Sequence, residues 1–208
     1  KWVVNSLNVQ NRVKKFYKKD SMVIYPPIEV GKFIDASKDV GKKDYFLIVS
    51  RLVGSKGLQE AAMAAKKEGF KLKISGSKAG LSGVAGNLEK LGGEMIELLG
   101  RVSDEKLPRL YAEAKGFIAL ARDEDFGITP VEAMASGTPV IAFNGGGFKE
   151  SVVDGVTGVL INDTKEETIG RAVKKILDTK WDKKELQKQA EKFSKEKFEM
   201  GIKRVVEK

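Results

Sequence analysis

The amino-acid sequence predicts a doubly wound α/β fold, and three observations carry that prediction. The apolar runs are short and continuous rather than alternating, several of them are rich in β-branched residues, and helical patterns fall between them. Continuous apolar runs are typical of strands buried on both faces of a parallel sheet. Their alternation with helices is typical of a doubly wound sheet. The length of 208 residues suffices for one large domain or two small ones.

The expected elements follow one another along the chain. Strands are expected where the short apolar runs lie, at Val3–Val4, Met22–Tyr25, Tyr45–Val49, Phe70–Ile74, Met95–Leu99, Phe117–Leu120, Val140–Phe143 and Val159–Ile161. Between the strands, Gly57–Lys67 places Leu58 and three alanines on one helical face. Asp104–Ala114 follows Ser103, a residue type that caps helix N-termini. Further helices are expected over Pro130–Ser136, Glu166–Leu177, Lys183–Phe193 and Lys195–Val206.

The composition excludes several classes of function. The 208 residues contain no cysteine and no histidine. Disulfides, cysteine nucleophiles, a Ser-His-Asp triad and zinc held by Cys or His are therefore impossible within these residues. The absence of cysteine also fits a reducing compartment, and no apolar run is long enough for a transmembrane helix, so we expect a cytoplasmic protein.

The net charge of +9 is concentrated at the two ends of the chain. Lysine and arginine outnumber aspartate and glutamate by ten to five over residues 1–44 and by thirteen to seven over residues 171–208. We favour solvated lysine faces on terminal helices as the explanation. The alternative is an anionic partner, such as a peripheral contact with a membrane surface. No basic motif interleaved with aromatic residues supports a nucleic-acid partner.

Functional residues are expected in the loops that follow strands, because doubly wound sheets bind ligands at the carboxyl ends of their strands. Arg51 and Lys56 follow the strand at 45–49 and lie at the start of a helix. Both could point at one anion with the help of the helix dipole, or they could be ordinary surface cations beside a turn. Gly76 follows the next strand and would let a ligand approach the backbone, although a plain turn explains it equally well. The loop around Val102 has similar geometry, with an N-capped helix start as its alternative explanation.

The most informative segment runs from Asp123 to Ala142. Thr129 and Glu132 fit a capping box, with proline at its preferred first helical position between them, which gives Glu132 a structural explanation. Glu124 lies in the preceding loop, where a carboxylate can accept hydrogen bonds from ligand hydroxyls. Two carboxylates across this loop–helix junction suit a polyol such as a sugar or a ribose.

A divalent cation is the alternative for the same loop. Asp123 and Asp125 form an Asp-x-Asp pattern that could hold a metal ion beside phosphates. Because Arg51 and Lys56 already offer neutralisation of phosphate charge, we expect no metal and no cofactor.

The ordered motifs resemble the signature of the retaining GT-B glycosyltransferases of family 4, the glycosyl transferases group 1. The resemblance covers nearly the whole chain and is carried by Arg51-Leu52-x-x-x-Lys56-Gly57, Leu99-Gly100-Arg101-Val102, Glu124-x-Phe126-Gly127-x-x-x-x-Glu132-Ala133-Met134-Ala135-x-Gly137-x-Pro139-Val140-Ile141-Ala142, Gly145-Gly146-Gly147-x-x-Glu150 and Asp154-Gly155-x-x-Gly158. It implies that the chain is the C-terminal, Rossmann-like, nucleotide-sugar-binding half of a GT-B fold. Residues 1–28 would join it to an N-terminal acceptor domain, and the closing helix at 195–208 could pack on that domain.

The resemblance also implies roles for individual residues. Arg51 and Lys56 would hold the donor diphosphate, and Glu124 would bind the donor sugar together with backbone groups of Phe126, Gly127 and Ile128. Further donor contacts are expected at Gly76, Val102, Thr129 and Glu132, with Glu132 on the ribose hydroxyls and the Val102 backbone on the base. Asp125 departs from the family pattern, which usually has a small residue there, and this puts the shape of the sugar loop in question.

The implied activity is retaining transfer of a hexosyl group from a GDP- or UDP-sugar to a glycan or lipid-linked acceptor, with mannose slightly favoured. The isolated half would bind the donor without efficient transfer. Two alternatives stay open at this point. One is another GT-B nucleotide-sugar enzyme, such as a 2-epimerase or a phosphorylase-like protein, and the other is a binding module without activity.

Overall fold

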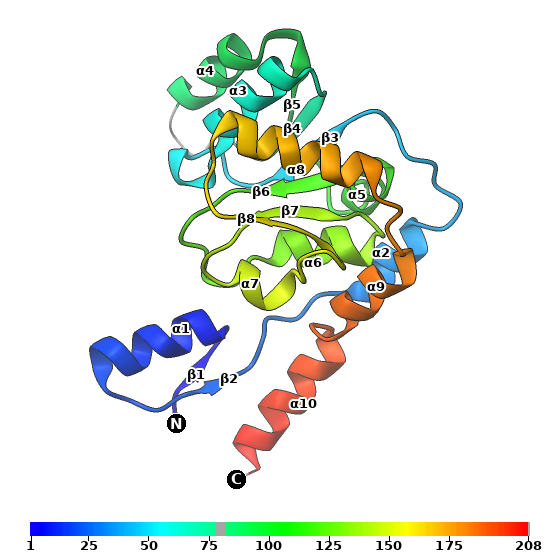
Figure 1. Ribbon diagram of the computed structural model, residues 1–208. Coiled ribbons are helices and arrows are strands. Elements are labelled where there is room, and N and C mark those ends of the chain that lie inside the picture. The colour runs from blue at the N-terminus through cyan, green and yellow to red at the C-terminus, as the bar shows by residue number, and fades with distance from the viewer. Residues whose placement is uncertain (78–81, 208) are drawn as a thin grey trace.

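A six-stranded parallel sheet forms the centre of the chain in the computed structural model, which describes residues 1–77 and 82–207. The strands run in the order β5-β4-β3-β6-β7-β8 (Figure 1). Their bounds are β3 Phe46–Val49, β4 Leu72–Ser75, β5 Ile96–Gly100, β6 Gly116–Ala119, β7 Val140–Phe143 and β8 Gly158–Ile161. The order reverses between β3 and β6, and this is the switch point at which doubly wound sheets bind ligands. The predicted fold class is confirmed.

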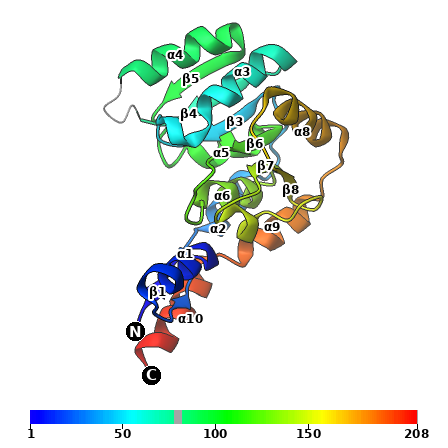
Figure 2. The same ribbon diagram turned by 60° about the vertical axis from the view of Figure 1, so that its left-hand side comes forward.

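Helices cover both faces of the sheet (Figures 1 and 2). Alternate residues of β3 show why: Phe46 and Ile48 belong to one buried cluster, whereas Leu47 belongs to the other. The first cluster lies under α3, α4 and α8, and the second lies under α2, α5, α6 and α9. These helices span Leu58–Glu68 (α3), Ser82–Gly92 (α4), Glu166–Asp178 (α8), Val30–Ala36 (α2), Leu107–Glu113 (α5), Ile128–Ala135 (α6) and Lys183–Glu191 (α9).

The predicted strands are confirmed to within one or two residues, but some helices were not predicted. The unpredicted helices are α1 (Leu7–Arg12), α2, α4 and α7 (Phe148–Ser151). Within α4, Gly86 and Gly92 weaken the helical pattern, and α7 is a single turn. The predicted helix start at Asp104 is wrong, because α5 begins at Leu107 and residues 104–106 form a turn. Lys106 is the residue at the capping position, without a side-chain hydrogen bond, so Ser103 is not the N-cap.

The N-terminal segment forms a small unit of its own below the sheet (Figure 1). Strands β1 (Val3–Val4) and β2 (Met22–Val23) pair in parallel, and α1 and a π-helical turn at Val13–Tyr17 connect them. The chain then runs through Pro26 and Pro27 to Ile28, which exchanges backbone hydrogen bonds with the Phe193–Lys195 segment before α10 (Lys195–Val206). In consequence α10 and the N-terminal unit lie side by side in both views (Figures 1 and 2).

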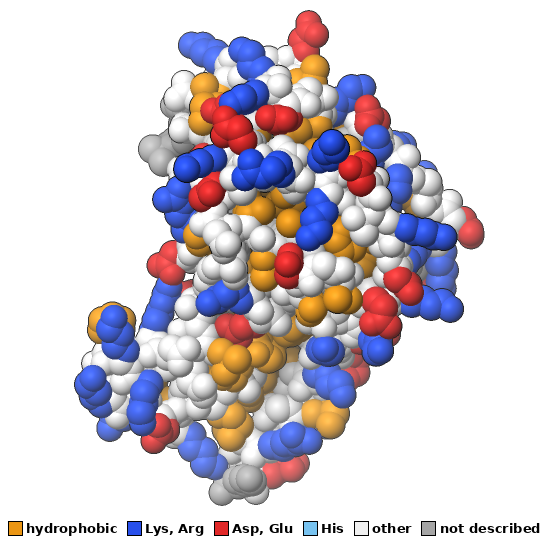
Figure 3. Space-filling view, viewed as in Figure 1, with side chains coloured by type: hydrophobic (Ala, Val, Ile, Leu, Met, Phe, Trp, Pro, Cys, Tyr) orange, Lys and Arg blue, Asp and Glu red, His pale blue; other side chains and the backbone are white. Residues whose placement is uncertain are grey.

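The surface of the N-terminal unit combines large apolar side chains with lysines. Phe16 and Tyr17 are 69% and 64% exposed, and Trp2, Val3, Leu7 and Met22 are exposed as well. Lysine and arginine side chains are spread over the lobe formed by α1 (Figure 3). Across residues 1–77 and 82–207, none of the helices is both long and apolar enough to cross a membrane.

Candidate donor-binding site

A cleft of about 410 Å³ opens at the carboxyl ends of β3 and β6, the two strands at the switch point. Its walls are the loop after β3, the loop after β6 and the start of α6. Seven of the ten predicted site residues line it: Arg51, Lys56, Glu124, Phe126, Gly127, Ile128 and Thr129. The structure therefore brings together the two predicted cations, the predicted sugar-binding carboxylate and the predicted backbone contacts.

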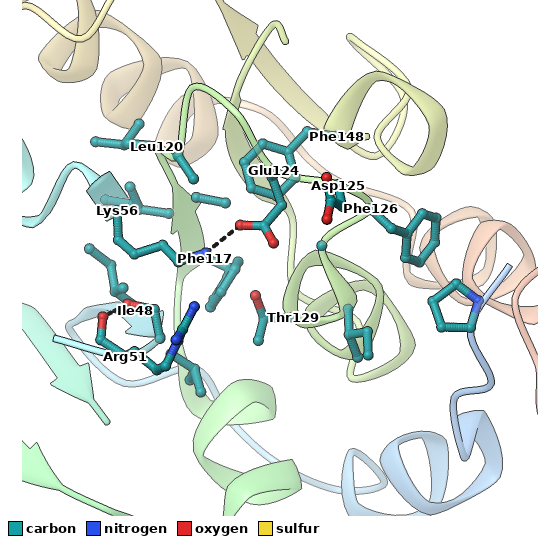
Figure 4. A pocket seen from close by; sticks show the side chains of 18 of the residues that line it. Ile48, Arg51, Lys56, Phe117, Leu120, Glu124, Asp125, Phe126, Thr129 and Phe148 are labelled. Atoms are coloured by element: carbon teal, nitrogen blue, oxygen red, sulfur yellow. Dashed lines mark hydrogen bonds and ion pairs between the residues drawn. The ribbon is translucent and has the colours of Figure 1, made fainter. Parts of the chain in front are cut away.

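An ion pair crosses the cleft between its two main walls (Figure 4). The Nζ atom of Lys56 lies 2.5 Å from Oε2 of Glu124, and the two side chains are only 20% and 24% exposed. Lys56 ends a 3₁₀ turn that begins at Gly54, and Gly57 follows it with a φ of 68°. A Cβ atom at Gly57 would lie 2.5 Å from Cβ of Leu120, so glycine is required for the loop to approach the end of β6.

The loop that carries Glu124 is fixed by the residues after it. The ring of Phe126 is buried against Tyr25 and Phe193, at centroid distances of 5.3 and 5.2 Å. Gly127 adopts a φ of 83°, a conformation that favours glycine, and α6 begins at the next residue. The ring of Phe126 thus anchors the loop, and the start of α6 lines the cleft with the N–H groups and positive dipole end of a helix.

The predicted capping box is wrong. Helix α6 begins at Ile128 and not after Thr129, and Gly127 occupies the capping position without a side-chain hydrogen bond. The carboxylate of Glu132 instead accepts a hydrogen bond of 2.7 Å from the hydroxyl of Tyr111, a fully buried side chain of α5. Because α6 begins at Ile128, Glu132 is its fifth residue and not the third, which a capping box requires. The sequence analysis did not identify Tyr111 as the partner of Glu132.

Burial raises the pKa of Glu132, and the hydrogen bond from Tyr111 opposes that rise. The ionised carboxylate is therefore held at a cost, and stability rises as the pH falls toward the raised pKa, because the folded state binds the proton more tightly than the unfolded state does. We expect Glu132→Gln to increase the free energy of unfolding at pH 7 by up to about 1 kcal/mol. The same substitution should weaken nucleotide binding about tenfold if the carboxylate holds ribose hydroxyls.

The control is Glu113→Gln, at a carboxylate of the same helix as Tyr111. At Glu113 burial acts to raise the pKa, but ion pairs with Lys43 and Arg109 outweigh it and lower the pKa. Urea denaturation should therefore show destabilisation for Glu113→Gln with unchanged nucleotide affinity. If both variants change stability in the same direction, the conclusion that the ionised Glu132 carboxylate destabilises the folded state is wrong.

Three of the predicted donor contacts, Gly76, Val102 and Glu132, lie outside the cleft lining. Gly76 packs against the backbone of Ser50, where an added Cβ would lie 1.8 Å from the carbonyl oxygen. The close approach of the two backbone segments therefore requires glycine at this position. The N–H of Gly76 donates to the Gly100 carbonyl at 2.8 Å. Val102 lies in the loop after β5, on the same edge of the sheet as the cleft.

Taken together, the cleft has a cationic end and an acceptor end. Arg51, Lys56 and the start of α6 can neutralise the charge of a diphosphate. The carboxylate of Glu124 can accept hydrogen bonds from hydroxyl groups. Both aspartates that flank Glu124 are paired with Arg12, which sequence reasoning also missed.

Comparison with known proteins finds relatives among the glycosyltransferases. The family profile described as glycosyl transferases group 1 matches residues 31–197. The chain is 27% identical over 203 residues to an uncharacterized glycosyltransferase of Methanocaldococcus jannaschii, covering 96% of this chain and 57% of that protein. It is 29% identical to the alpha-1,3/1,6-mannosyltransferase of Dictyostelium discoideum, covering 93% of this chain and 57% of that protein. The chain thus spans less than two thirds of the length of these relatives.

The fold matches a solved structure as well. The HepE protein of Anabaena, solved in complex with UDP and glucose, superimposes with a TM-score of 0.81 at 21% sequence identity, covering 99% of this chain and 62% of that chain. Such an identity supports the fold, and the six-stranded sheet matches one Rossmann-like half of the GT-B glycosyltransferases. With four fifths of its length inside the family profile, the chain belongs to the glycosyl transferases group 1.

Proposed function

We propose that the chain supplies the donor site of a retaining, nucleotide-sugar-dependent glycosyltransferase of family 4. The observation that carries the proposal is the meeting of Arg51, Lys56, Glu124 and the start of α6 in one cleft. The transferred group is a hexose from a GDP- or UDP-sugar, with mannose favoured because a relative of 29% identity is named a mannosyltransferase. The acceptor is a glycan or a lipid-linked glycan.

The proposed chemistry is electrostatic. Cleavage of the bond between the anomeric carbon and the diphosphate leaves negative charge on the nucleotide and an oxocarbenium-like sugar. Arg51, Lys56 and the helix N-terminus stabilise that leaving group, and they need no metal for it. Glu124 orients the sugar through its hydroxyls, Glu132 holds the ribose, and the Val102 backbone contacts the base.

The proposed domain organisation explains the unusual N-terminal surface. Two-residue parallel strands do not form a stable sheet alone, and parallel sheets are normally covered on both faces. We assign residues 1–28 to a joining segment whose exposed apolar side chains, Phe16 and Tyr17 among them, pack on an acceptor domain. The closing helix from Lys195 lies beside this unit and would contact the same domain. The lysines of the unit support a peripheral contact of the whole protein with an anionic membrane face.

The test is calorimetric titration of the 208-residue chain with GDP, UDP and ADP, each with and without Mg²⁺. One nucleotide is expected to bind without the metal, and Arg51→Ala is expected to lose most of that binding. Binding of none of the three would contradict the donor-site assignment. Efficient transfer by the 208-residue chain alone would contradict the assignment of the acceptor site to another domain.

A further inference from the structure

Helix α1 is fastened to the loop that carries Glu124. Arg12, the last residue of α1, places Nη1 2.8 Å from Oδ1 of Asp125 and pairs through Nη2 with Oδ1 of Asp123. These residues are more than one hundred positions apart in the sequence.

Further contacts fix the rest of α1 on the same region. The side-chain amide of Asn8 donates to the backbone carbonyl of Glu124 at 3.2 Å, and the N–H of Gly147 donates to the same carbonyl at 2.8 Å. At the start of α1, the carboxylate of Glu150 accepts from the N–H groups of Leu7 and Asn8 at 2.8 and 2.9 Å. The helix is thus held at both of its ends and cannot shift along the loop without breaking hydrogen bonds.

The three acidic side chains of the loop point in two directions. Asp123 and Asp125 are drawn to Arg12, whereas Glu124 between them reaches across the cleft to Lys56. Asp125 lines the cleft together with Glu124, but of the three carboxylates only that of Glu124 pairs with Lys56, while Arg12 holds the other two. We propose that Arg12 is a positioning residue that directs the Glu124 carboxylate into the cleft through Asp123 and Asp125.

This inference rests on the proposed function and makes it more specific. Glu124 is assigned to the sugar, whereas Arg51, Lys56 and Glu132 are assigned to the nucleotide. Loss of the Arg12 contacts should therefore weaken binding of the sugar moiety and leave binding of the nucleoside diphosphate unchanged. Through Arg12, the joining segment of residues 1–28 thereby acts on the sugar end of the donor site.

The experiment compares two dissociation constants for each protein by calorimetry. GDP is paired with GDP-mannose, and UDP with UDP-glucose, so that the ratio within a pair isolates the sugar. In the unaltered chain the sugar is expected to strengthen binding. Arg12→Ala should lower that gain about fivefold, the effect of two partly exposed charged contacts, and should leave the affinity for GDP or UDP unchanged. Arg12→Lys, which can reach one aspartate, should restore part of the gain.

The matched control is Lys14→Ala, which removes a cation of the same segment that pairs with Asp20 at 2.5 Å and not with the loop. It should leave both dissociation constants unchanged. The inference is overturned if Arg12→Ala keeps the full sugar gain, if it weakens diphosphate and nucleotide sugar equally, or if the unaltered chain shows no sugar gain. Failure of the unaltered chain to bind any nucleotide would instead overturn the proposed function.

Discussion

Replacing Lys56 with alanine is expected to weaken binding of a nucleoside diphosphate by about tenfold to a hundredfold. A hydrogen bond from a charged group to a ligand anion contributes about 1.5–3 kcal/mol, and each 1.4 kcal/mol is a factor of about ten in affinity. The ammonium group of Lys56 is mostly buried at the wall of the cleft, so water cannot replace it fully. A nucleoside monophosphate, which lacks the second phosphate, should lose much less affinity in the same variant.

Two comparisons make the Lys56 result interpretable. Lys38→Ala removes a largely exposed lysine in the turn after α2 that is also paired with an acid, Asp35 at 2.8 Å, and it should not change binding. Glu124→Gln removes the partner of Lys56, so it should retain or strengthen diphosphate binding while weakening binding of the nucleotide sugar. Equal losses for monophosphate and diphosphate in Lys56→Ala would contradict the assignment of Lys56 to the diphosphate.

Replacing Gly76 with alanine is expected to lower the free energy of unfolding by about 2–4 kcal/mol. The added Cβ would lie 1.8 Å from the carbonyl oxygen of Ser50 and 2.9 Å from its carbon, and both are backbone atoms that no side-chain rotation can move. The loop after β3 must shift, and Arg51 moves with it. Urea denaturation should therefore show the loss of stability, and calorimetry should show weaker diphosphate binding together with it.

The matched control for this substitution is Gly31→Ala in α2. An added Cβ at Gly31 meets nothing within 4 Å, and alanine is the better helix former. This variant should keep or raise stability, by up to about 1 kcal/mol, with unchanged binding. Equal stabilities of the two variants would show that the close approach at Ser50 can be relieved without cost.

The sheet and the main site residues could be predicted because both depend on local signals. Each core strand is a continuous apolar run, and Arg51, Lys56 and Glu124 all follow such runs. Because the carboxyl ends of parallel strands lie at the same edge of the sheet, the three residues meet in one cleft. The α2 and α4 helices lack a comparable signal. Glycines interrupt α4, and only Val30 and Phe33 are buried in α2.

The contacts that could not be predicted join residues far apart in the chain. The capping box around Glu132 is a plausible local pattern, but α6 begins at Ile128 and the carboxylate instead pairs with the hydroxyl of Tyr111, 21 residues away in the sequence. Likewise, neither Arg12 nor Asp125 carries a sequence signal for the other. Periodicity and capping rules describe neighbours within a few residues, and such pairings depend on the tertiary fold.

The strand order has a consequence for how the chain folds. The β3–β4–β5 half and the β6–β7–β8 half of the sheet each consist of consecutive strands, and the two halves are joined by the pairing of Phe46 and Leu47 in β3 with Gly116 and Phe117 in β6. Contacts within a half are local and close early, whereas the seam between β3 and β6 must close a long loop. The cleft takes Lys56 from one half and Glu124 from the other, so it exists only after the seam has closed. A nucleotide sugar that binds across the cleft, as proposed, is therefore expected to link the two halves and to slow their separation.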